Sequence, residues 1–128
     1  MDQSSEQSKS REQAIALARR LDELGADSVV ALDVSRSSPF TDCFVIAGAQ
    51  SVAQMRGFRR RIVELVDELD LETRRNRKRD EDGGWLLIDC TTVIIHIMLP
   101  EQREFYDLEK LWFDAERIFD ASDTRTDV

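Results

Sequence analysis

The sequence has few residues suited to cross-linking, metal binding or membrane insertion. It holds one histidine and two cysteines in 128 residues, too few and too widely spaced for a zinc site or a disulfide framework. Its longest apolar-leaning run, 93–99, contains His96 and is far too short to span a bilayer. The first six residues have neither a basic start nor an apolar run, so no signal peptide is expected. These absences favour a soluble intracellular protein.

Catalytic signatures are missing as well. No G-x-S-x-G, P-loop or G-x-G-x-x-G motif occurs. Asp33, Asp42 and Asp89 stand at the ends of apolar runs, but no D-x-[DE] pair accompanies them, so two-metal phosphoryl transfer has no ligand set. His96 lies among aliphatic residues and is interpreted as a structural histidine. We therefore expect no enzyme, no catalytic residue, no metal and no cofactor.

The length and the apolar content of the chain are sufficient for one folded domain. The chain is 41% hydrophobic and 34% charged, which excludes compositional disorder. Cys43 and Cys90 each lie in an apolar run, which predicts buried structural thiols. We expect a loose polar tail over 1–9, a domain over 10–120 and a second polar tail over 121–128.

The charge is unevenly distributed. The net charge is −8, with −3 over residues 1–55, +4 over 56–79 and −9 over 80–128. An acidic C-terminal third favours a basic partner, but on charge alone a merely solvated acidic surface is the preferred interpretation. The basic run 74–79 lacks interleaved aromatic residues and is followed at once by three acidic ones. It is interpreted as a charged loop, with contact to an RNA backbone as the alternative.

Hydrophobic periodicity predicts the secondary structure. Short β-branched apolar runs indicate buried strands, and apolar residues at helical spacing indicate helices. Ser10 with Gln13, and Ser51 with Gln54, match the capping box that begins a helix. The predicted elements are a helix over 11–24, strands over 29–34 and 43–47, a helix over 52–69, strands over 71–75, 85–90 and 93–99, and a last helix from Pro100 whose apolar face holds Phe105, Leu108, Leu111, Trp112, Ala115 and Ile118 or Phe119.

This order, α-β-β-α-β-β-β-α, indicates a single α/β domain with a mixed sheet of about five strands flanked by helices. The connection between the first two strands is too short for a helical crossover, so these strands are expected to pair antiparallel. The last helix carries large residues on more than one side, among them Tyr106, Glu109 and Trp112. Tryptophan and tyrosine often anchor protein interfaces, although core filling accounts for them equally well.

Five segments of the sequence together match a known pattern. They are ALDVS at 31–35, TDCFVIA at 41–47, GWLLID at 84–89, VIIH at 93–96 and, most specifically, REFYDLEKLW at 103–112. In their order and spacing, over roughly residues 26–113, they resemble the ribosomal silencing factor family, also called Iojap-like.

This resemblance implies a nucleotidyltransferase-like fold without an active site, and a cytoplasmic translational repressor. It implies binding to the large ribosomal subunit through ribosomal protein fourteen, which sterically blocks joining of the small subunit, and it implies a homodimer. The partner-binding residues are expected to be Trp85, Asp89, Tyr106, Asp107, Leu108, Glu109 and Trp112. A minor contact to ribosomal RNA is expected from Arg74, Arg75, Arg77, Lys78 and Arg79.

The chain departs from the family pattern in three places. Thr91 and Thr92 stand where members usually have Gly-Asp, the region around 77–80 replaces a Glu-Gly pair, and the chain continues past Trp112 where some members stop. Two other functions stay open: a nucleotide-handling enzyme on the same fold, and an RNA-binding adaptor that acts through the basic run.

Overall fold

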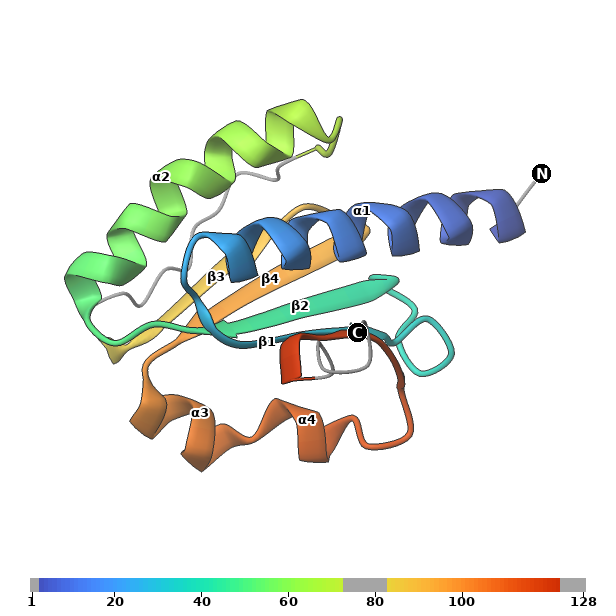
Figure 1. The fold of residues 1–128 in the computed structure, drawn as a ribbon. Coiled ribbons are helices and arrows are strands. Elements are labelled where there is room, and N and C mark those ends of the chain that lie inside the picture. Colours follow the sequence, from blue (N-terminus) through green and yellow to red (C-terminus); the bar gives the residue numbers. More distant parts are fainter. Residues whose placement is uncertain (1–2, 73–82, 123–128) are drawn as a thin grey trace.

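A central sheet with helices on both faces forms the fold (Figure 1). In this computed structural model, residues 3–72 and 83–122 are described. The elements in chain order are α1 (Gln3–Glu23), β1 (Asp27–Asp33), β2 (Cys43–Gly48), α2 (Val52–Glu68), β3 (Trp85–Asp89), β4 (Val93–Met98), α3 (Pro100–Tyr106), α4 (Leu108–Leu111) and β5 (Glu116–Asp120).

The five strands form one mixed sheet in the order β3-β4-β2-β1-β5. β2 and β4 run parallel, and every other neighbouring pair is antiparallel. The antiparallel pairing of β1 with β2 confirms the expectation from their short connection. Because β2 and β4 are parallel, their carboxyl ends lie side by side at one end of the sheet, next to the start of α3.

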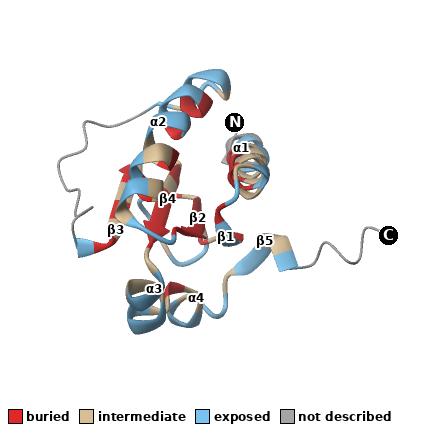
Figure 2. Ribbon diagram, turned by 60° about the vertical axis from the view of Figure 1, so that its left-hand side comes forward, coloured by how far each residue is buried: buried red, intermediate tan, exposed pale blue. Residues whose placement is uncertain are grey.

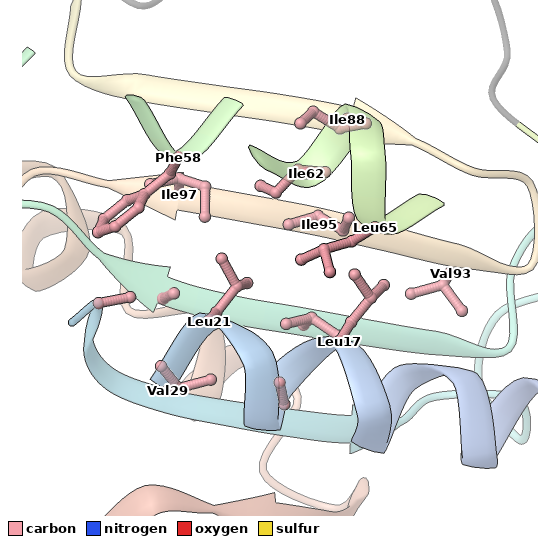
Figure 3. Packing of buried hydrophobic residues seen from close by; sticks show 14 of the residues in the cluster. Leu17, Leu21, Val29, Phe58, Ile62, Leu65, Ile88, Val93, Ile95 and Ile97 are labelled. Carbon is pink, nitrogen blue, oxygen red and sulfur yellow. The ribbon is translucent and has the colours of Figure 1, made fainter. Parts of the chain in front are cut away.

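α1 and α2 cover one face of the sheet, and α3 and α4 lie on the other (Figure 2). The larger core lies under the first two helices. Figure 3 shows Leu17 and Leu21 of α1 over β1 and β2, and Phe58 and Ile62 of α2 over β3 and β4. Because both faces of the sheet are covered by helices, the strand sequences are nearly continuous apolar runs.

A smaller core lies on the second face. Along β1, Val29 and Ala31 point into the larger core while Val30 and Leu32 point into the smaller one, as the alternation of a strand requires. Val34, Phe44, Ile46, Met98 and Leu108 complete the set of buried residues in the smaller core. This second face carries the candidate functional residues.

The predicted helix cap at Ser51 and the two predicted buried thiols are confirmed. Ser51 is the N-cap of α2, and its side chain accepts a hydrogen bond from the Gln54 amide. Cys43 and Cys90 are buried free thiols, and burial raises the pKa of each to about 12. Within the described ranges, no helix combines the length and apolar character needed to cross a membrane.

The predicted start of the first helix is wrong. α1 begins at Gln3 rather than near residue 11, so Ser10 lies inside the helix instead of capping it. Ser10 is buried, and its hydroxyl donates to the Asp42 carboxylate at 2.9 Å. The Gln13 amide donates to the backbone carbonyl of Leu69. Both side chains thus fasten α1 to other segments, which a local sequence motif does not reveal.

The predicted edge strand over 71–75 is not formed where it can be checked. Leu71 and Glu72 belong to no strand, and Leu71 instead packs against the larger core. The remainder of that segment lies outside the described residues. The fifth strand of the sheet comes from the C-terminal region instead.

The prediction of a single last helix is also wrong. The helix that begins at Pro100 ends at Tyr106, because the next residue, Asp107, has a left-handed φ of 40° that is incompatible with a continuous helix. After α4 the chain forms β5, which pairs with the free edge of β1. The order is therefore α-β-β-α-β-β-α-α-β. Phe105 and Leu111, expected in the core, are 78% and 69% exposed.

An ion-pair network holds β5 to the rest of the domain. Arg11 of α1 donates to Asp33 at the end of β1 at 2.5 Å and to Glu116 at the start of β5 at 3.1 Å. Burial opposes ionisation of Asp33, but hydrogen bonds from Ser35 and Arg11 outweigh it and hold the pKa of Asp33 below its ordinary value.

We expect Arg11→Met to loosen β5 with only a small loss of global stability, because partly exposed ion pairs are weak. Amide hydrogen exchange should become faster in β5 than in β2. Arg20→Met is the matched control, since Arg20 pairs with Glu68 of α2 and not with β5. Unchanged exchange in β5 would show that strand pairing alone holds this element.

Candidate docking face

A chain of aromatic rings runs across the second face of the sheet from the core to the surface. Trp112 packs on Phe44 at a centroid distance of 5.3 Å, and Phe44 packs on His96 at 4.9 Å. His96 then contacts Trp85 at 5.9 Å, and Trp85 contacts Tyr106 at 4.8 Å. Residues from β2, β3, β4, α3 and the end of α4 thus meet in one cluster.

Trp85 stands at the start of β3, where a glycine turns the chain into the strand. Gly84 has a φ of 90°, and a Cβ at this position would lie 3.2 Å from a methyl group of Leu99. A side chain is therefore disfavoured there by both conformation and space. The indole N–H of Trp85 donates to Nδ1 of His96 at 3.1 Å. Trp85 is half-buried and firmly placed.

Tyr106 is the point at which the cluster reaches solvent. It is the last residue of α3 and is 46% exposed. Phe105 lies edge to face with it at 4.9 Å and is 78% exposed. Two adjacent exposed aromatic rings, one of them supported by the half-buried indole of Trp85, form the kind of apolar anchor found at protein interfaces.

Trp112 and Leu108 lie beneath this surface rather than on it. Leu108 is buried in the smaller core, and Trp112 is partly buried against the same core. Both residues were predicted partner contacts. Their placement supports α4 from below, so the structure gives them a supporting role.

Asp107 and Glu109 place negative charge next to the aromatic rings. The Asp107 carboxylate accepts a hydrogen bond from the Lys110 amide at 3.3 Å and so caps α4 after the break. Glu109 pairs with Arg103 at 3.2 Å and with Arg117 at 3.9 Å. These contacts fix both carboxylates on the α3–α4 side of the sheet.

A cleft of about 650 Å³ opens beside the rings, where β2 and β4 end. Gly48 and Met98 are among its lining residues, and Arg103 is the only basic one among those in the described part of the chain. Its acidic lining residues are Asp27, Glu104, Asp107 and Glu109. An excess of carboxylates suits a basic group and disfavours a phosphate.

Asp89 does not join this cluster. It is the last residue of β3, four residues from Trp85 and so about 13 Å along the strand. Its carboxylate accepts a hydrogen bond from the Thr91 amide at 2.8 Å, which stabilises the turn into β4. The basic residues 74–79 lie outside the described part of the chain.

Sequence reasoning missed the residues that connect the cluster. Phe44 and His96 join Trp112 to Trp85, but both are embedded in apolar strands and look like ordinary core positions. Burial lowers the pKa of His96 to about 4, so the imidazole is neutral at physiological pH. Among the described residues, no group of His, Cys, Asp and Glu is placed to hold a metal ion.

Comparisons with known proteins identify the family. The family model described as "Ribosomal silencing factor during starvation" matches residues 7–128. A ribosomal silencing factor of Bacillus subtilis is 33% identical over 98 residues, which cover 77% of this chain and 82% of the relative. The chain belongs to the ribosomal silencing factor family.

Organellar proteins and solved structures agree with membership of the ribosomal silencing factor family. The chloroplast Iojap protein of maize is 30% identical over 112 residues, 88% of this chain and 48% of that protein. A crystal structure from Chromobacterium violaceum has a TM-score of 0.66 at 25% identity and covers 84% of both chains. One from Bacillus halodurans has a TM-score of 0.62 at 30% identity and covers 79% of this chain and 90% of that one. The family's α/β fold is therefore shown.

Proposed function

We propose that this protein binds the large ribosomal subunit through ribosomal protein fourteen and sterically prevents the small subunit from joining. The observation that carries the proposal is the Trp85–Tyr106 pair, which brings a supported aromatic ring to the surface in a chain of the silencing factor family. Such a protein acts as a translational repressor in the compartment that holds the ribosomes, which is the cytoplasm in a bacterium.

A steric repressor needs a surface and no chemistry. A specific interface of standard size buries about 1,600 Å² in total, and a few aromatic anchors supply most of its binding energy. Tyr106 and Phe105 are exposed and adjacent, so they can enter a partner without refolding. The absence of catalytic motifs from the sequence agrees with this role.

Charge favours a basic partner for the same face. Residues 100–115 hold five acidic and two basic side chains. Glu109 is paired with both Arg103 and Arg117, so the acidic excess comes from the other carboxylates, Asp107 among them. Lysine and arginine side chains of a ribosomal protein would complement Asp107 and the cleft beside it. Charge of this kind accelerates encounter and fixes orientation more than it adds affinity.

The proposed contact residues divide into three roles. Tyr106 is the central anchor, with Trp85 beneath it. Asp107 and Glu109 supply charge, and Leu108 with Trp112 support α4 from below. Asp89 takes part only if the partner covers the whole length of β3. A contact from the basic run 74–79 to ribosomal RNA remains a separate proposal.

We further propose that the free protein is a homodimer. The sheet ends in two edge strands, β3 and β5, and edge strands offer unpaired backbone groups to a second copy. Analytical ultracentrifugation of the free protein measures this directly.

The test of the proposed function is co-sedimentation with separated ribosomal subunits. We expect the protein to pellet with the large subunit and not with the small one, and to dissociate as salt is raised, because the face is charged. Equal pelleting with both subunits would contradict a specific site. Failure to pellet with either subunit would contradict ribosome binding and would favour a nucleotide-dependent activity instead.

A further inference from the structure

His96 is a buried titratable residue that steric blocking does not require. It occupies the middle of β4, between Ile95 and Ile97, and is 5% exposed. Its ring lies on the second face of the sheet, edge to face with Phe44. An aliphatic side chain at this position would pack without the cost of removing an imidazole from water.

The hydrogen bonds of the imidazole define its tautomer. Nδ1 accepts the indole N–H of Trp85, so the proton of the neutral ring is on Nε2. Nε2 is buried, and no described residue accepts its proton. The histidine thus makes one good hydrogen bond and leaves the other polar atom unpaired. Its benefit to the protein must come from the Nδ1 acceptor.

That acceptor controls the residue beneath the proposed anchor. Trp85 contacts both His96 and Tyr106. Without an acceptor the indole N–H would be half-buried and unsatisfied, and the ring would gain from rotating toward water. Rotation of Trp85 would remove the support on which the Tyr106 ring rests.

We propose that His96 is a positioning residue for the docking face: its Nδ1 holds the indole of Trp85, which in turn holds the ring of Tyr106 in the orientation the partner meets. This inference rests on the proposed function for its effect on binding. The local part, that His96 fixes Trp85, stands independently of any ribosomal partner.

The local part is tested first in the free protein by the tryptophan indole N–H signals in an ¹H–¹⁵N NMR spectrum. The chain has two tryptophans, and Trp85→Phe assigns their two signals. We expect His96→Leu to shift the Trp85 signal and to speed its exchange with water, while the Trp112 signal changes little. His96→Asn, whose Oδ1 replaces the Nδ1 acceptor, should retain a protected Trp85 signal. An unchanged Trp85 signal in His96→Leu would overturn the proposal.

The effect on binding is tested by a double-mutant cycle on large-subunit affinity. His96→Leu should weaken binding about tenfold, equivalent to about 1.4 kcal/mol. The same change in a Trp85→Phe background should have no further effect, because the hydrogen bond is already absent. Equal weakening in both backgrounds would mean that His96 acts by another route and would overturn the proposal.

Ile95→Val is the matched control for general destabilisation. Ile95 neighbours His96 in β4 but points into the larger core on the opposite face. The control should lower the melting temperature at least as much as His96→Leu and leave binding unchanged. If Ile95→Val weakens binding as much as His96→Leu, stability rather than positioning explains the loss. Suppose that the wild type itself is found not to bind the large subunit, while the NMR result on Trp85 is as expected. That outcome would contradict the proposed function but would leave the positioning of Trp85 by His96 established.

Discussion

Replacing Tyr106 with alanine should weaken binding to the large ribosomal subunit by about 2 kcal/mol or more, roughly 30-fold, while the fold survives. Tyr106 is 46% exposed at the end of α3, so its ring contributes little to the core. Its packing on Trp85 holds it ready for contact, which lowers the entropy lost on binding.

Two variants make the Tyr106 experiment specific. Val63→Ala removes an apolar side chain that is 65% exposed on α2, on the opposite face of the sheet, and should not alter binding. Tyr106→Phe keeps the ring and should retain most of the affinity. Circular dichroism and urea unfolding verify the fold of each variant. Normal binding by Tyr106→Ala, or its failure to fold, would show that the docking face is assigned wrongly.

The second prediction with a large expected effect is a loss of folding stability at acidic pH. The pKa of His96 is about 4 in the folded protein because burial disfavours the charged imidazole, against an ordinary value of 6.5. Between these values the unfolded chain binds a proton that the folded chain does not. The free energy of unfolding is therefore not reduced by His96 above pH 6.5, and it falls as the pH is lowered toward 4. The expected loss is on the order of 2 to 3 kcal/mol, since one pKa unit corresponds to about 1.4 kcal/mol.

Urea unfolding of wild type and His96→Leu at several pH values measures this effect. His96 is the only histidine, so the wild type should lose stability from pH 7 to 4.5 and the variant should lose much less. Hydrogen bonds hold the pKa values of Asp33 and Asp120 below the ordinary value for aspartate despite burial. The contributions of these two carboxylates to the free energy of unfolding are therefore lost only at a pH below the range in which His96 acts. Equal pH profiles for both proteins would show that His96 is not the group responsible.

Local sequence patterns predicted most of the regular structure. β1 to β4 were predicted because each is a short apolar run, and β1, β2 and β4 are also rich in β-branched residues. α2 was predicted because Phe58, Ile62 and Leu65 repeat at helical spacing and Ser51 caps them. These signals depend only on residues close in sequence.

The segment after Asp107 was mispredicted because its structure depends on distant residues. The spacing from Phe105 to Phe119 fits a helix, but residues 116–120 pair with the open edge of β1 and complete the sheet. A sequence pattern shows neither an unpaired edge nor a single left-handed residue such as Asp107.

The candidate site was predictable in part. Resemblance to the family pointed to Trp85 and Tyr106, and the structure brings their rings together. It gave no sign that Phe44 and His96 connect them to Trp112, because this contact crosses three strands. It also grouped Asp89 with the others, although Asp89 lies at the far end of β3.

A subunit-joining assay tests the central proposal most directly. Purified large and small subunits are mixed with increasing amounts of wild-type protein or of Tyr106→Ala, and the joined ribosomes are measured by sedimentation. We expect the wild type to suppress joining in proportion to its occupancy of the large subunit, and the variant to require roughly 30-fold more protein. Normal joining of large subunits that are saturated with the wild-type protein would contradict steric silencing.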